Sequence, residues 1–407
     1  MWWDLLPPEF NPGPPPKGEI FWSLHQAFLA ESGYTLRPKY EPGWRPPPWK
    51  TEFEMIFSAE YDTYKKRSIM DATRTSDGRL LTLKSVSKSV HPHEAPIGRF
   101  LSSPPLASDP KNHCVPIFDV LQSPLDDDVQ IIVMPRLYDF NDTPFDTVGE
   151  LLDCFRQIFE GVEFMHKHFV AHRQVYLASV LDMHDCTLLN IVLDPDKMYP
   201  EGFNPVSPNL APNRSDLKPV KYITRTKCWP RYYLIDFGIS RRYDPSNGPP
   251  MEPPISGGDK HAPEHSIITV NPPWVDDCNP FPTDMYYLGS LLKRTFFDTF
   301  PPLQFLSPLT DDMIQWDPNM RPTIGEVIQR FAVLCNQRTT WQLRLPGCPE
   351  RATFHQKLRQ LKYFLLRIPP LPSTPFATDR TIDNASLRPF YTLTPARLAA
   401  HKSLGLF

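Results

Sequence analysis

The run Tyr232-Tyr233-Leu234-Ile235-Asp236-Phe237-Gly238 is the most informative part of this chain. Its first four residues are apolar or aromatic and predict a short buried strand. The Asp-Phe-Gly sequence that follows predicts a turn, because glycine leaves the backbone free to adopt unusual dihedral angles. The strand therefore delivers the carboxylate of Asp236 into a turn. Three residues alone form a weak motif, so its weight depends on the rest of the sequence.

Four further motifs accompany this run in a fixed order. They are Asp185-Cys186-Thr187-Leu188-Leu189-Asn190 upstream, and Ala262-Pro263-Glu264, Asp284-Met285-Tyr286-Tyr287-Leu288-Gly289 and Asp317-Pro318-Asn319-Met320-Arg321-Pro322-Thr323 downstream. The five-residue spacing from Asp185 to Asn190 is followed by the apolar run Ile191–Leu193, which predicts a second short strand. Five matches in one order are too many for coincidence.

In this order the motifs resemble those of the eukaryotic protein kinase superfamily, and the chain looks like a divergent, fungal-type member of it. The resemblance covers roughly residues 60–335. It implies an α+β fold of two lobes, a small antiparallel β-rich lobe with one helix and a larger helical lobe. It also implies ATP and Mg²⁺ as cofactors, and transfer of the ATP γ-phosphate to a protein hydroxyl, with Ser/Thr favoured over Tyr.

Composition and periodicity divide the chain into four parts. These are a proline- and aromatic-rich extension (1–50), a strand-rich lobe (51–139), a helix-rich lobe (140–337) with insertions at 174–184 and 195–218, and a tail (338–407). Strands are predicted at 68–74, 80–86, 115–121 and 129–134, and helices at 20–29, 94–101, 147–168, 284–297, 324–335 and 354–367. The proline-rich insertion 195–218 is expected to be a surface loop.

Phosphoryl transfer needs positioning and charge neutralisation more than covalent help from the protein. By resemblance, Asp236 and Asn190 would hold the magnesium ion from two sides. Asp185 would orient the acceptor hydroxyl and take its proton. All three residues are therefore candidates for the catalytic site.

The strand-rich lobe supplies the remaining candidates for nucleotide binding. Lys84, which has apolar neighbours on its strand, resembles the lysine that contacts the α- and β-phosphates. Glu94 resembles its partner on a helix, although a solvent-facing carboxylate is the competing reading. Met134 and Arg136 occupy the place of the gatekeeper and hinge, where adenine would bond to the main chain. All four would belong to the ATP site.

Two further features of this resemblance concern the stability of the fold rather than catalysis. Glu264 and Arg321 resemble the buried ion pair that ties the activation segment to the larger lobe. Asp284 resembles the residue that holds the backbone of the catalytic loop from a central helix. Such pairs stabilise the fold because breaking one leaves an unpaired buried charge.

Two departures from the family pattern put catalysis in question. Residues 57–67 contain no glycine where a phosphate-binding glycine loop is expected. The loop that begins at His172-Arg173 is interrupted by Gln174–His184 before it reaches Asp185. The alternative function is therefore a pseudokinase, a binding scaffold or switch with weak or no nucleotide turnover.

The overall composition places few other constraints on function. The 407 residues carry a net charge of −3 and 41% hydrophobic residues, which predicts folded domains and gives no general attraction to nucleic acid. Seven scattered cysteines and no evident signal peptide suggest an intracellular protein, cytoplasmic or nuclear. No apolar run is long enough to span a membrane. The basic amphipathic stretch 354–367 could lie on a membrane surface, but packing against the larger lobe is the favoured reading.

Overall fold

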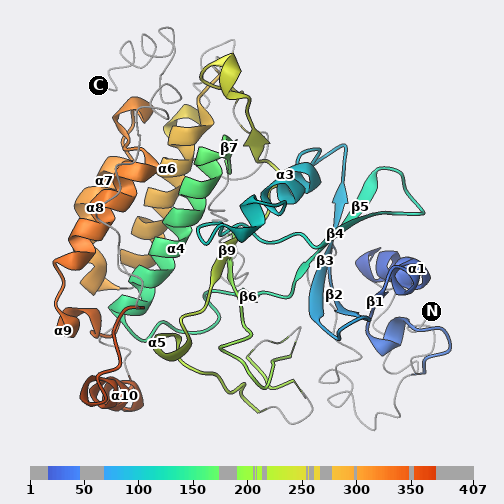
Figure 1. The fold of residues 1–407 in the computed structure, drawn as a ribbon, viewed down its shortest axis with the longest axis horizontal. Coiled ribbons are helices and arrows are strands. Elements are labelled where there is room, and N and C mark those ends of the chain that lie inside the picture. Colours follow the sequence, from blue (N-terminus) through green and yellow to red (C-terminus); the bar gives the residue numbers. More distant parts are fainter. Residues whose placement is uncertain are drawn as a thin grey trace. The chain divides into compact units, whose positions relative to one another are not determined.

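The computed structural model describes residues 17–45, 68–173, 190–204, 207, 209–212, 218–253, 255, 261–265, 277–297, 300–347 and 353–372. The fold is α+β, as predicted, with an antiparallel sheet followed by a mainly helical region (Figure 1). The chain separates into two compact units. The first comprises Met1–Ser103, Val115–Tyr138 and Asp194–Ile223, and the second comprises Pro104–Cys114, Asp139–Leu193 and Thr224–Phe407.

The first unit is built on a sheet of five antiparallel strands in the order β1-β2-β3-β5-β4. The strands are β1 (Tyr34–Thr35), β2 (Ile69–Arg74), β3 (Leu80–Ser87), β4 (Asp119–Gln122) and β5 (Val129–Pro135). The predicted turn between β2 and β3 is confirmed, and Gly78 takes the positive φ of 72° there that glycine adopts without strain. The strand predicted from residue 115 begins only at Asp119. Pro116 has no backbone N–H to give to a ladder, which explains the later start.

Two helices cover opposite faces of this sheet. Trp22 and Leu29 of α1 (Lys17–Glu31) are buried in one core cluster together with Ile131 and Val133 of β5. Ala95 of α3 (Glu94–Leu101) packs in another cluster with Ile132, which points the other way because side chains alternate along a strand. Pro96 falls in the first turn of α3, where its missing N–H costs nothing.

The insertion expected to be a surface loop of the helical lobe instead groups with the first unit. Tyr199 and Phe203 pack their rings on Tyr138, with ring centroids 4.8 and 4.7 Å away. The guanidinium of Arg136 lies 4.3 Å from the centroid of Phe203 and donates to its carbonyl at 3.2 Å. Polar, proline-rich composition concealed these aromatic anchors, so the loop prediction was only partly right.

The second unit is mainly helical. Its α-helices are α4 (Val148–Lys167), α5 (Arg225–Cys228), α6 (Pro280–Leu291), α7 (Ser307–Met313), α8 (Ile324–Asn336), α9 (Thr340–Leu343) and α10 (Phe354–Leu365), and α6 continues as a π-helical segment, Leu292–Phe297. Thr147 caps α4 by accepting from the N–H of Glu150, which fixes the start of that helix. Helix α4 lies along α8, and the rings of Phe159 and Phe331 meet edge to face at 5.1 Å.

Short strands lie in the part of the second unit that carries the predicted site residues. Strand β7 (Val170–Ala171) pairs with β10 (Arg241–Arg242), and β8 (Ile191–Leu193) pairs antiparallel with β9 (Tyr232–Leu234). Strand β6 (Tyr138–Asp139) lies where the chain passes from the first unit to the second. In the described part of the chain, no helix has the length and apolar character required to cross a bilayer.

Glu264 and Arg321 form a fully buried bidentate ion pair in the second unit. The two guanidinium nitrogens lie 2.7 and 2.8 Å from the two carboxylate oxygens, and the Thr283 hydroxyl donates to the same carboxylate at 2.6 Å. Burial alone would raise the pKa of Glu264. The charge and hydrogen bonds of Arg321 outweigh that effect and lower the pKa to about 2.

This pair predicts a specific loss of stability in acid. Unfolded Glu264 has a pKa of about 4.3. Its contribution is therefore fully present above that value and is lost as the pH falls towards 2. The Glu264→Gln variant should be about 3–5 kcal/mol less stable near pH 7, and its unfolding free energy should fall less steeply between pH 4.5 and 2. Urea unfolding at a series of pH values measures both effects.

The control is Asp311→Asn, which breaks the exposed pair with Lys293. Solvent screens that pair, so its loss should barely change stability. Equal effects of the two substitutions would contradict the buried ion pair.

Candidate functional site

Asn190 and Asp236 emerge from the same end of the β8–β9 pair. Ile191 lies opposite Leu234 in the antiparallel register, so the residue before β8 and the residues after β9 leave the pair together. The pairing extends one step further, since the Ile235 N–H donates to the Asn190 carbonyl at 2.9 Å. The two residues predicted to hold a metal ion are thus brought together by strand pairing.

Asp236 has an unusual backbone. Its φ of 67° lies in the left-handed region, which aspartate tolerates better than most residues but still at a cost of about 1–3 kcal/mol. The next residue, Phe237, is buried, and its side chain anchors the turn. Such strain persists only where the surroundings impose it, and it gathers at functional sites.

A buried carboxylate on α6 holds the loop that runs beside this turn. Asp284 accepts from the N–H of His172 at 2.9 Å and from the N–H of Arg173 at 2.7 Å, using both oxygens. His166 Nε2, from the end of α4, donates to the same carboxylate at 2.9 Å. The resemblance implied that Asp284 would hold this backbone, and the structure shows these hydrogen bonds.

His172 connects that loop to the Asp236 turn. Its Nε2–H donates to the Ile235 carbonyl at 3.1 Å, and its own carbonyl accepts from the Ser240 hydroxyl at 3.0 Å. Burial lowers the pKa of His172, although the nearby carboxylates of Asp284 and Asp236 oppose this. The imidazole is therefore neutral at pH 7, in the tautomer that donates from Nε2. Ile235, the residue before Asp236, is thus bonded to Asn190 through its N–H and to His172 through its carbonyl.

The first unit holds the predicted pair of Lys84 and Glu94. Lys84 lies on β3 between Ile69 of β2 and Ile132 of β5. Its Nζ lies 2.5 Å from Glu94 Oε1, and Glu94 is buried. Of the two readings of Glu94, the structure shows the ion pair rather than a solvent-facing carboxylate. The pair fixes the lysine ammonium beside the sheet.

The predicted hinge residues lie at the end of β5. Met134 faces Thr82 across the β3–β5 ladder and packs beside Val86 and Ile132. The N–H of Arg136 donates to the Leu80 carbonyl over a long 3.3 Å bond. A purine that bonded to this N–H would have to replace that weak contact.

Several sequence predictions fall outside the described residues. These are Asp185, the insertion 174–184 and the glycine-free segment 57–67. Sequence reasoning also missed His166 and Ser240 as supports of the site. No spacing in the sequence pointed to them, because each contact joins residues more than 60 positions apart.

No protein-family model matches this chain, and no curated protein has a matching sequence. The interpretation of the site therefore rests on its own residues and their geometry.

Removing the Asp284 carboxylate should loosen the loop and the turn together. The Asp284→Ala variant leaves the N–H groups of His172 and Arg173 buried without their acceptor, at roughly 1–3 kcal/mol each. We expect the unfolding free energy to fall by roughly 2–5 kcal/mol, measured by urea denaturation.

Hydrogen exchange provides a second measure, because the amides of His172 and Arg173 should lose protection. The control is Asp312→Ala, which removes an exposed partner of Arg330. A destabilisation no larger than that of the control would show that Asp284 does not hold this loop.

Proposed function

We propose that this chain is an ATP- and magnesium-dependent protein kinase that phosphorylates Ser or Thr hydroxyls of protein substrates. The observation that carries the proposal is the placement of Asn190 and Asp236 at one end of β8–β9, with Asp236 in a strained turn beside His172. The five ordered motifs support it, because their spacing matches the parts that phosphoryl transfer requires.

The residues fit a magnesium ion. A carboxylate oxygen of Asp236 and the amide oxygen of Asn190 are hard oxygen donors, the type that Mg²⁺ prefers, and Mg²⁺ often takes only one or two protein carboxylates with phosphate oxygens besides. The ion, when bound, neutralises charge on the phosphates. The strand pairing and His172 hold the main chain of the turn that carries Asp236, as a pre-organised metal site requires.

The residues also fit the phosphates of ATP. An ammonium group held by a buried carboxylate has a defined position, and Lys84 has such a partner in Glu94. A point charge suffices to bind phosphate oxygens. In the proposed reaction Lys84 orients the α- and β-phosphates, and Asp185 positions the acceptor hydroxyl and accepts its proton.

A scaffold or switch of the pseudokinase type is the second candidate. It is favoured by Gln174–His184, which interrupts the catalytic loop, and by the glycine-free 57–67 segment. A displacement near 1 Å can lower a rate by about a hundredfold. In this case the buried ion pairs would preserve the fold while turnover is lost.

Activity measurements on purified protein separate the two candidates. With Mg²⁺, labelled ATP and generic protein substrates, we expect phosphate transfer by the full chain or by a form that lacks Gln174–His184. Transfer should fall by at least roughly a thousandfold in Asp236→Ala, which removes metal charge neutralisation. Lys84→Met should lose at least roughly a hundredfold, because a positioned cation is removed.

The matched controls are Asp311→Ala and Lys88→Met, which change an exposed aspartate on α7 and an exposed lysine in the turn that follows β3. Both should retain full activity. If the full chain and the shortened form are folded yet neither transfers phosphate, the kinase proposal fails and the scaffold reading replaces it. If Asp236→Ala stays active, the assignment of the metal ligands is wrong.

A further inference from the structure

Helix α10 is oriented with its polar face towards the second unit. Arg359 and Gln356 donate to the carboxylate of Asp146, at 2.5 and 3.1 Å, and the Tyr363 hydroxyl lies 2.9 Å from that of Thr224. Gln360 is buried on the same side. A helix that packs by apolar burial does the reverse and points its polar residues outward. The tail helix therefore packs on the larger unit, but not through its apolar stripe.

The apolar stripe of α10 consequently faces outward. Phe354, Leu358, Leu361 and Leu365 follow each other at spacings of four, three and four, so they lie on one face of the helix. They are 73, 48, 50 and 71% exposed. Trp341 of α9, itself exposed, extends this surface because its ring lies 6.1 Å from that of Phe364. We call these six residues the α10 apolar face.

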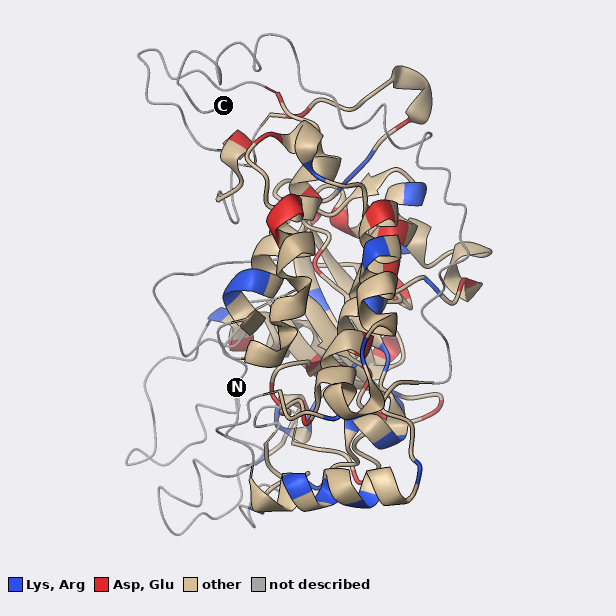
Figure 2. Ribbon diagram, turned by 90° about the vertical axis from the view of Figure 1, so that its left-hand side faces the viewer, with Lys and Arg blue, Asp and Glu red and all other residues tan. Residues whose placement is uncertain are grey.

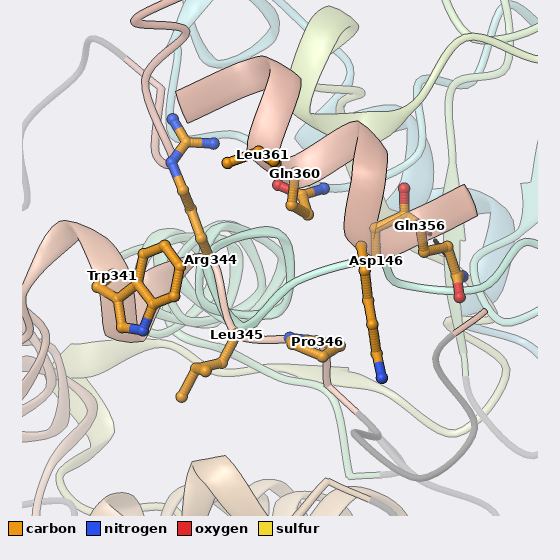
Figure 3. Close-up of a pocket in the computed structure, with 9 residues that line it drawn as sticks. Asp146, Trp341, Arg344, Leu345, Pro346, Gln356, Gln360 and Leu361 are labelled. Atoms are coloured by element: carbon orange, nitrogen blue, oxygen red, sulfur yellow. Dashed lines mark hydrogen bonds between the residues drawn. The ribbon is translucent and has the colours of Figure 1, made fainter. Parts of the chain in front are cut away.

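Figure 3 shows helix α10, with Gln360 and Leu361, above the segment that carries Trp341 and Arg344. A cavity of about 220 Å³ opens beside the helix. Trp341 and Leu361 of the α10 apolar face line part of it, and its lining also includes Arg344, Gln356 and Gln360. Gln356 and Gln360 line the cavity together with Asp146, which accepts the hydrogen bond from Gln356. The apolar residues of α10 are therefore not closely packed against the rest of the second unit.

The charged residues of α9, α10 and the described segments next to them are all positive. The described residues 338–347 and 353–372 contain Arg338, Arg344, Lys357, Arg359, Lys362 and Arg367, and they contain no aspartate or glutamate. In Figure 2, where α10 is the helix at the bottom, it shows blue bands and no red one. Lys357 and Lys362 are exposed and flank the stripe on its two sides. This cationic surface contrasts with the net charge of −3 of the whole chain.

We propose that the α10 apolar face binds the surface of an anionic phospholipid membrane. An interfacial helix needs an apolar face that enters the acyl boundary and cationic side chains that reach the headgroups, and α10 has both. Trp341 supplies the ring type that favours the interface. A second copy of the chain fits less well, because the flanking lysines would meet like charges.

Vesicle flotation with the full chain tests the proposal. We expect binding to vesicles of phosphatidylcholine with 30% phosphatidylserine, and at least tenfold weaker binding to pure phosphatidylcholine. The double variant Leu358→Gln/Leu361→Gln removes two residues that would enter the membrane and should weaken binding by at least roughly tenfold. Lys357→Gln/Lys362→Gln should weaken binding to the anionic vesicles roughly fivefold per lysine, and added salt should reduce the difference.

The matched control is Leu24→Gln/Val333→Gln. Those residues are exposed to a similar extent, 54 and 50%, on α1 and α8. The control should bind like the unchanged chain. Glutamine favours helix, so circular dichroism should be unaltered in every variant.

Three results would overturn the proposal. One is no binding of the full chain to the anionic vesicles, which would leave an acidic protein partner as the occupant. Another is vesicle binding that the Leu358→Gln/Leu361→Gln variant retains in full. The third is concentration-dependent dimerisation that this variant abolishes while vesicle binding is absent, since the face would then be an interface between two copies.

Discussion

One buried carboxylate, that of Asp284, holds the backbone next to the candidate site. Backbone N–H groups in a loop cannot be buried without an acceptor, because an unmade hydrogen bond costs about 1–3 kcal/mol. Asp284 satisfies two consecutive N–H groups, those of His172 and Arg173, from the side of a helix. An ionised carboxylate accepts from both at once, which a neutral side chain does less strongly. The backbone at His172 and Arg173 is therefore held in place by a side chain rather than by regular secondary structure.

His172 links the backbone held by Asp284 to the turn that carries the proposed metal ligand Asp236. The side chain of this residue bonds to the Ile235 carbonyl, next to Asp236, while its main chain is held by α6 and by Ser240. A carboxylate at the end of a strand is precise only when the turn around it is rigid. The left-handed backbone of Asp236 is compatible with such a rigid turn, because the surrounding contacts can offset its cost. The residues that stabilise this turn thus lie directly beside the proposed metal ligand.

Sequence reasoning worked best where the pattern is local. Apolar periodicity gave α4 and α8 nearly to the residue, and motif spacing singled out the Glu264–Arg321 pair. It failed where contacts join distant segments. The Asp284–His166 bond spans 118 positions, and the aromatic anchors of 194–223 are isolated among prolines. Periodicity also revealed the stripe on α10 but not which side faces the protein, since ion pairing with Asp146 decides that.

The position of Trp22 determines where the first folding unit of this protein begins. Helix α1 lies outside the stretch that carries the five ordered motifs, yet Trp22 and Leu29 are almost fully enclosed against β2, β3 and β5. A shortened chain that began at β2 would leave that side of the sheet bare to solvent, together with the unpaired edge that β1 otherwise covers. Such a fragment would be prone to associate through its exposed sheet. Helix α1 is therefore an integral part of the first unit, and the sheet could be transferred to another protein only together with this helix.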